Sequence, residues 1–325
     1  MASDSHRHRL RSPGPMAQAG DAALTALASL MIGLLQRMPL TLVARVGRQF
    51  GFLAYLLDAR HRKMATRNIQ ACLPDHALPS QASKLALENQ RRIGESYCCA
   101  IKTASMAPEE IDQHLKVIGT EKLYSLAQQS PSGVVIVAIG HFGNFELYAR
   151  LPGLPSNYRR ATTYRGLRQP GLNRLMQKLR QRSGCLFFER RAQAGELRKA
   201  LSDGQLILGL LADQHAGDGG LWLPFFGREC STNAAPAVLA LRYKAPLVTA
   251  ICHRTDLAQW TVEYEEPIPT TENGEPRSPK AIMLDVNRRY EAAIRKDPAN
   301  WFWVHNRWKP RRRQPTGSVS PQPGV

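Results

Sequence analysis

The strongest constraint on the fold is a continuous apolar run at residues 133–140, which reads GVVIVAIG and is rich in β-branched side chains. A strand without polar alternation is typically buried on both faces, as in the interior of a largely parallel sheet. A second run of this kind, QLILGLLA, occupies residues 205–212. The chain therefore predicts an α/β domain in which helices cover both faces of a sheet.

Strand-like and helix-like segments alternate along the rest of this region. Further strands are predicted at residues 160–164, 185–188, 246–253 and 259–265. Helices are predicted at residues 144–150, 171–182, 192–201, 233–244 and 281–295. The alternation favours a single mixed, largely parallel sheet sandwiched by helices. Residues 60–106 also have a helical pattern, which Pro74 and Pro79 interrupt.

The N-terminal segment has a different character. Residues 22–35 form an apolar run that is shorter than the roughly 20 residues needed to span a bilayer. Residues 40–57 have apolar side chains at helical spacing, with Arg45 and Arg48 on the other side. This pair of helices favours a segment that lies on, or partly in, an anionic membrane. Two helices that pack within a soluble domain are the alternative.

These patterns divide the chain into four parts. We predict a disordered basic tail at residues 1–20 and membrane-associated helices at residues 21–58. The α/β domain is expected to cover residues 59–309, and a basic, proline-rich tail to follow at residues 310–325.

The charge of the chain is strongly positive, at a formal +18. Such a charge predicts attraction to nucleic acid, to an anionic membrane, or to an acidic carrier protein or phosphorylated substrate, without choosing among them. Two basic clusters are candidate docking surfaces: Arg60, Arg62, Lys63 and Arg67, and Arg307, Lys309 and Arg311. The six cysteines include no CxxC pair, which predicts reduced thiols and no cysteine-built zinc site.

The candidate chemistry lies in the segment IGHFGNFE, where the first buried strand meets its helix. His141 and Glu146 are five residues apart, and neither a helix nor a strand brings side chains at that spacing together. A turn can do so; Gly143 supplies flexibility and Asn144 is a good helix N-cap. Ligand crevices in α/β sheets lie at such strand ends. The spacing alone is weak evidence, because a histidine that merely caps a helix would also fit.

The sequence around this pair resembles that of a known family. GHFGNFEL resembles the HxxxxD/E acyltransferase motif, in the form typical of the lipid A lauroyl/myristoyl acyltransferases, the late lipid A acyltransferases of bacteria. Tyr164 and Arg165 resemble the family's YR motif, and Asp213-Gln214 followed by LPFFG resembles its DQ…FFG block. WFWVHNRWKPR at residues 301–311 resembles its closing signature. Glu146 stands where many members have aspartate.

The resemblance implies a fold like that of the glycerol-phosphate acyltransferases. It also implies transfer of an acyl chain from acyl-carrier protein to a phosphorylated lipid A precursor, at the cytoplasmic face of an inner membrane, without a cofactor or metal. His141 would be the general base, since an ordinary imidazole pKa of about 6.5 suits proton transfer near neutral pH. Glu146 would hold its tautomer. The expected substrate-binding residues are Asn144, Arg165, Asp213, Gln214 and Gly227.

Alternatives remain at this point. An enzyme of the same fold could use acyl-CoA or acylate another lipid, and a histidine-based enzyme could hydrolyse thioesters. A non-catalytic nucleic-acid-binding protein is disfavoured, although tryptophans and basic residues interleave at residues 301–309. Asp213 and Gln214 could instead bond the backbone of a turn. His215 and His253 lack a paired ligand spacing and are interpreted as structural.

Overall fold

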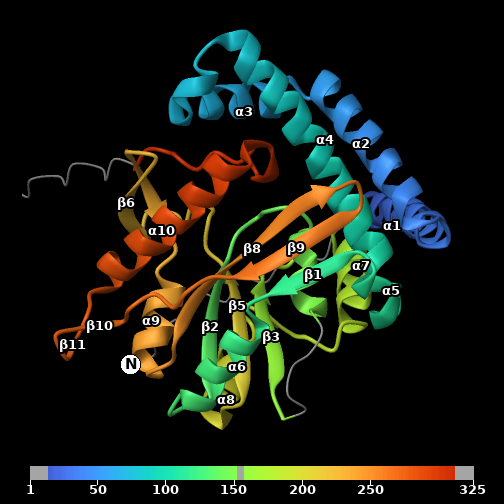
Figure 1. Ribbon diagram of the computed structural model, residues 1–325. Coiled ribbons are helices and arrows are strands. Elements are labelled where there is room, and N and C mark those ends of the chain that lie inside the picture. Colours follow the sequence, from blue (N-terminus) through green and yellow to red (C-terminus); the bar gives the residue numbers. More distant parts are fainter. Residues whose placement is uncertain (1–13, 152–156, 312–325) are drawn as a thin grey trace, which may run out of the picture.

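The computed structural model describes residues 14–151 and 157–311, which fold around a seven-stranded sheet (Figure 1). The strand order is β1-β9-β8-β2-β5-β3-β4. The bounds of these strands are β1 Leu115–Ile118, β2 Val134–Ile139, β3 Arg159–Tyr164, β4 Leu186–Glu189, β5 Leu206–Leu211, β8 Leu247–Asp256 and β9 Gln259–Tyr264. Strands β8, β2, β5, β3 and β4 are parallel neighbours, whereas β9 runs antiparallel to β8. The predicted mixed, largely parallel sheet is confirmed.

Helices cover both faces of this sheet, because successive side chains of β2 and β5 are buried on opposite sides. One face packs against helices that include α3 Ala59–Cys72, α8 Ala194–Asp203, α9 Ala235–Arg242 and α10 Pro279–Lys296. The other packs against α2 Leu40–Leu57, α5 Pro108–Asp112, α6 Thr120–Gln129 and the 3₁₀ helix η2 Phe145–Arg150. The long helix α4, Pro79–Thr103, contributes to both cores. Helix α7 spans Pro170–Gln181.

Several short elements were not predicted from the sequence. They are the hairpin of β6 Leu221–Phe225 and β7 Arg228–Thr232, the edge strand β1, the pair β10 Thr271–Glu272 and β11 Glu275–Pro276, and the 3₁₀ helices η1 Pro74–His76 and η3 Pro298–Asn300. The helical pattern at residues 144–150 proves to be a 3₁₀ helix. These segments have no long apolar run, and packing rather than local pattern selects them.

Helix α1, Pro15–Arg37, begins earlier than the sequence suggested. Residues 15–20 were assigned to a disordered tail but form its first turns, while the tail residues 1–13 and 312–325 lie outside the described part. Among the described helices, the segment Met16–Arg37 alone is long and apolar enough to cross a membrane, by length and composition. The apolar run therefore extends into a helix of spanning length, which corrects the expectation of a short one.

Helix α2 packs unusually closely against α4 because glycines line their crossing. A Cβ atom on Gly51 would lie 2.2 Å from the carbonyl oxygen of Gln90, and one on Gly94 would lie 2.1 Å from that of Gly47. Any side chain at these positions would push the backbones apart. The N-terminal helices are thus joined to the rest of the protein by a fixed contact (Figure 1).

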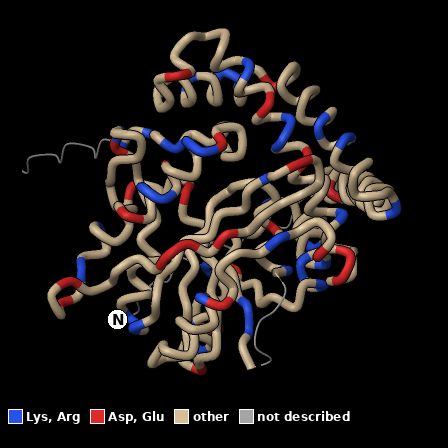
Figure 2. Tube along the Cα trace, in the orientation of Figure 1, with Lys and Arg blue, Asp and Glu red and all other residues tan. Residues whose placement is uncertain are grey.

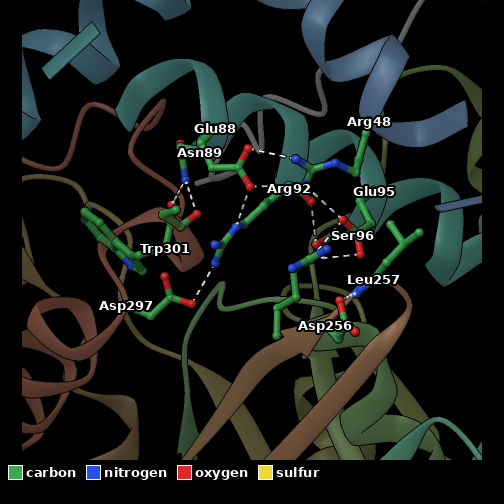
Figure 3. A network of polar contacts seen from close by, with 12 residues as sticks. Arg48, Glu88, Asn89, Arg92, Glu95, Ser96, Asp256, Leu257, Asp297 and Trp301 are labelled. Atoms are coloured by element: carbon green, nitrogen blue, oxygen red, sulfur yellow. Dashed lines mark hydrogen bonds and ion pairs between the residues drawn. The ribbon is translucent and has the colours of Figure 1, made fainter. Parts of the chain in front are cut away.

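Ion pairs reinforce the same junction (Figure 3). Arg48 of α2 donates to Glu88 at 2.8 Å and to Glu95 at 3.3 Å, and Glu95 is buried. Glu95 also accepts from Arg254 at 2.9 Å, which joins α4 to β8. Arg92 links Glu88 to Asp297, beyond α10. Arg48 therefore faces α4, whereas the sequence pattern had placed it on a polar face beside the membrane.

Candidate active site

Two polar residues meet at the carboxyl ends of the neighbouring parallel strands β2 and β5. Ile139 is in register with Leu211, so the residues two positions later, His141 and Asp213, emerge side by side. The Nδ1 atom of His141 lies 2.7 Å from Oδ1 of Asp213. The sequence had placed both residues at one sheet edge but had not paired them.

Asp213 is buried and accepts three hydrogen bonds. Its Oδ2 atom accepts from the backbone amide of His141 at 2.7 Å and from the indole of Trp301 at 2.9 Å. Burial by itself raises the pKa of this carboxyl, but the adjacent imidazole and the hydrogen bonds outweigh it and lower the pKa to about 2. Asp213 is therefore ionised at neutral pH, which keeps the proton of His141 on Nδ1 and leaves the Nε2 lone pair free to accept.

Aromatic side chains surround the imidazole. The ring of Phe145 lies 4.8 Å from that of His141 in an edge contact, and the ring of Phe302 lies 5.6 Å away. Tyr97 of α4 packs edge-on against both phenylalanines. These rings restrict the orientation of the imidazole and reduce its access to water.

Two asparagines, on α3 and α4, hold the segment that carries Trp301, and Figure 3 shows the one on α4, Asn89. Asn89 of α4 donates to the carbonyl oxygens of Ala299 and Trp301. Asn68 of α3 donates to those of Trp303 and His305 at 2.9 and 3.1 Å. Both asparagines are buried, so their bonds are shielded from water. Sequence reasoning missed this role, since neither residue stands in a recognisable motif.

Gln214 completes the surroundings of His141, with its Nε2 atom 3.3 Å from Nε2 of the imidazole. The guanidinium of Arg307 donates to the carbonyl oxygens of Gln214 and Ser231 and to Thr232. Arg307 is fully buried. It therefore holds the loop after β5, and the suggestion that it belongs to an exposed docking cluster is wrong.

Glu146 contacts a different partner from the one expected. Its carboxylate accepts from Nη2 of Arg180 at 2.6 Å and from Nε at 3.3 Å. The Arg180 guanidinium also lies over the rings of Tyr164 and Phe187, at 5.6 and 5.2 Å from their centroids. The carboxylate beside the imidazole is thus Asp213 rather than Glu146, because the turn after β2 directs the two side chains of the motif to different neighbours.

The remaining predicted residues are dispersed. Arg165 is exposed and lines the pocket described below. Asn144 occupies the N-cap position of η2, but its buried side chain makes no capping bond, so its predicted capping contact is absent. Gly227 lies at the tip of the β6–β7 hairpin, where Phe226 and Gly227 both have positive φ (52° and 69°), and it is outside the pocket lining. Its place is that of a turn residue.

A cavity of about 490 Å³ opens beside His141 and runs along the sheet. Its lining includes His141, Gln214, Arg165, Glu146 and Arg180, with apolar side chains of β2 and β5 further in. Within the described ranges, no serine lines this cavity. Cys185 lines it, but burial raises the pKa of its thiol to about 12, so that it is not a thiolate at neutral pH. The site therefore offers a base, and direct attack by a bound hydroxyl suits it better than a covalent enzyme intermediate.

Comparison with known proteins identifies the family of the chain. The sequence profile of the bacterial lipid A biosynthesis acyltransferases matches residues 18–310. The chain belongs to this family. It is 27% identical to a lipid A biosynthesis acyltransferase of Haemophilus influenzae over 87% of this chain and 89% of that protein. It is 25% identical to the lipid A biosynthesis palmitoleoyltransferase of Escherichia coli, over 87% and 89%, and 24% identical to its lauroyltransferase, over 89% and 92%.

Membership establishes that the protein is an acyltransferase of lipid A biosynthesis. The polar site and the elongated cavity are the features of this acyltransferase that suit such a reaction. His141 lines the cavity together with apolar side chains of β2 and β5.

Substitution of Glu146 by glutamine in this acyltransferase is expected to lower turnover by about tenfold, the loss typical of one charge-assisted hydrogen bond. The pH at which kcat/KM is half-maximal should stay unchanged, because Asp213 and not Glu146 contacts the imidazole. Steady-state kinetics across pH provide the measurement. Arg180→Gln should cause a similar loss, and the double variant should be no worse than either single one. A shifted pH profile in Glu146→Gln would contradict this view.

The surroundings of His305 indicate that the folded state loses stability in acid. Its Nε2 atom accepts from the backbone amide of His215 at 3.0 Å, and burial lowers its pKa from 6.5 to about 4. The unfolded chain therefore binds this proton at higher pH than the folded one does. The associated stability is complete above pH 6.5 and is lost as the pH falls toward 4, by up to roughly 3 kcal/mol. The check is to measure the melting temperatures of wild type and His305→Gln between pH 6.5 and pH 4. If both melting temperatures fall with pH by the same amount, the prediction is wrong.

Proposed function

We propose that the protein transfers a fatty acyl chain from an acyl-carrier protein thioester to a hydroxyl group of a lipid A precursor, with His141 as general base. The observation that carries the proposal is the buried pair of His141 and ionised Asp213 at the mouth of the cavity. We further propose that the domain has the glycerol-phosphate-acyltransferase type of fold and acts at the cytoplasmic face of the inner membrane.

The proposed reaction has two steps. The acceptor hydroxyl replaces Gln214 at Nε2 of His141 and loses its proton to that nitrogen as its oxygen attacks the thioester carbonyl carbon. Asp213 stabilises the imidazolium that forms. The C–S bond then breaks, and the imidazolium returns the proton to the departing thiolate. Arg165 and the amide of Gln214 are candidate donors to the oxyanion, since both line the cavity.

The positive charge suits both proposed partners, since an acidic carrier protein and a phosphorylated glycolipid are both anionic. Figure 2 shows lysine and arginine residues over several parts of the molecule rather than in one stripe. Arg60, Lys63 and Arg67 are exposed on α3 and are candidate docking residues. Arg62 is different, because it donates to the carbonyl oxygens of Tyr55 and Leu56 at the end of α2.

The test is transfer of a labelled acyl chain from acyl-carrier protein to a lipid A precursor, run beside the matching acyl-CoA. We expect a lower KM for the carrier-bound donor, and that KM should rise steeply with salt, because charge steering is screened over about 10 Å at 0.1 M. Equal or better use of acyl-CoA, with no salt effect, would reject the carrier as donor. If neither donor gives transfer to the lipid A precursor, the proposed reaction is rejected.

A charge reversal refines the carrier-docking test. Lys63→Glu together with Arg67→Glu should raise the KM for carrier-bound donor without changing that for acyl-CoA. Lys199→Glu is a control for charge reversal outside α3, since Lys199 is an exposed cation on α8 that pairs with Asp203. If the α3 double variant changes the KM for carrier-bound donor and for acyl-CoA equally, as the control does, α3 is not the docking surface.

Helix α1 is proposed to attach the protein to the membrane. Leu27, Leu30 and Leu34 are more than half exposed although they are strongly apolar. We expect Leu27→Asp combined with Leu30→Asp to move the full-length protein from washed membranes to the soluble fraction, since each aspartate costs about 3 kcal/mol within a bilayer. Val238→Asp, on exposed α9 surface, is the control. A double variant that pellets like wild type without aggregating would contradict attachment through α1.

A further inference from the structure

The floor of the cavity consists of side chains from neighbouring parallel strands, arranged in rows. Ile139 and Leu211 form the row nearest to His141. Val137, Gly209, Thr162 and Phe187 form the next row, and Ile207 and Arg160 form the third. Successive rows are two residues apart, so that the third lies roughly 13 Å from the first at about 3.3 Å per residue. The cavity therefore follows the strands inward from the catalytic edge.

The middle of this floor is open because Gly209 has no side chain. A Cβ atom there would meet nothing closer than 3.6 Å, the distance to Cδ1 of Ile139. A larger side chain at position 209, between Val137 and Thr162, would narrow the channel at this row. An extended apolar chain can thus pass over Gly209 toward the third row.

The third row ends the apolar surface with a charge. The side chain of Arg160 has no hydrogen bond or ion pair with any residue in the described ranges, and its Nη1 atom is inaccessible to water. Burial lowers the pKa of its guanidinium. The neutral Tyr264, Cys185 and Tyr124 lie near it, and so does a second cation, Arg150. The hydroxyl of Tyr124 is likewise buried without a partner. A cation without a counter-ion is an unusual end for an apolar channel.

We propose that Arg160 sets the length of the acyl chain that the cavity accepts, by ending its apolar part with a cation. This inference rests on the proposed function, since it takes the cavity to hold the acyl chain of the donor. A methyl end that reaches the guanidinium removes its remaining hydration and offers no hydrogen bond in return. An acyl chain that ends before the third row keeps the full favourable free energy of burying its apolar surface. A longer chain loses part of that free energy, because its end meets the guanidinium.

The test compares Arg160→Met with Arg159→Met. Arg159 is the matched control, because it is the exposed neighbour on the same strand. The proteins compete for an equimolar series of even-numbered saturated acyl donors from decanoyl to palmitoyl, and mass spectrometry identifies the acylated products. Arg160→Met should prefer a chain at least two carbons longer than wild type. Each methylene newly accommodated should improve relative use by about fourfold. Arg159→Met should keep the wild-type preference.

A substitution in the middle row should act in the opposite direction. Gly209→Val places a side chain over the channel, so the preferred chain should become shorter than that of wild type. An unchanged preference in Arg160→Met would overturn the proposal, whatever Gly209→Val does. The melting temperature should not fall in Arg160→Met, since no hydrogen bond or ion pair of the described residues is lost; a lower value together with wild-type selectivity would make Arg160 merely structural.

Failure of the proposed function gives a different result. If wild type transfers no acyl chain at all, stabilisation by free fatty acids of the same lengths still tests Arg160. A longer optimum chain in Arg160→Met than in wild type would support the inference, and the same optimum in both would reject it.

Discussion

Replacement of His141 by alanine is expected to lower transfer by roughly 10²–10⁴-fold, the usual loss when a general base is removed. The expectation follows from the position of Nε2, which Asp213 keeps unprotonated by holding the proton on Nδ1. Acyl transfer by purified enzyme, at saturating donor and acceptor, is the measurement. The loss should appear in kcat, because the imidazole acts as the hydroxyl attacks rather than during binding.

His114→Ala is the control for this substitution. His114 contacts Ala258 and Gln259 beside the edge strand β1 and does not line the cavity. It should retain wild-type turnover. Wild-type turnover in a folded His141→Ala protein would show that another group takes the proton. The melting temperature must be compared, because His141 also packs against Phe145 and Phe302.

Substitution of Asp213 by asparagine is expected to have an effect of similar size. The loss should approach about 10⁴-fold, as in hydrolase triads where the same change leaves the imidazole in the wrong tautomer. Asparagine keeps the shape of the side chain but cannot stabilise the imidazolium. The pH dependence of kcat/KM should shift as well, because the charge next to the base is lost.

A milder substitution tests the same interaction between Asp213 and His141. Trp301→Phe removes one of the three donors to Asp213 and should lower turnover by only about tenfold. Asp256→Asn, at the exposed end of β8, should have no effect. If Asp213→Asn is as active as wild type while Glu146→Gln is inactive, the carboxylate of the motif acts on His141 during turnover, and the pairing described above is a resting arrangement.

The sheet was largely predictable, because its central strands are apolar on both sides. The runs at residues 133–140 and 205–212 became β2 and β5 with nearly the same limits. The β6–β7 hairpin was missed, since Trp222 and Pro224 do not alternate with polar residues in a regular way. Its register depends on the contacts of Arg307 and Asn287, which are distant in sequence.

The active site was predicted only in part. The sequence placed His141, Asp213 and Gln214 at one edge of the sheet, because they follow buried parallel strands. It did not disclose which carboxylate meets the imidazole, since that depends on the register of β2 with β5. The resemblance of the motif to the acyltransferase family favoured Glu146, which is near in sequence but bound to Arg180. The role of Asn89 and Asn68 was beyond sequence reasoning, because it depends on the docking of the last described residues.

That docking has a consequence for the order in which the protein becomes active. The indole that bonds Asp213 and the guanidinium that holds Gln214 both come from residues 301–307, which leave the ribosome after everything else in the domain. A growing chain can assemble the sheet and the cavity without them. The proposed base, however, obtains its complete set of partners only when this segment closes against α3 and α4. The pair of His141 and Asp213 is therefore complete only in a finished domain, in which helices α1 to α4 were synthesised before the segment that completes the site.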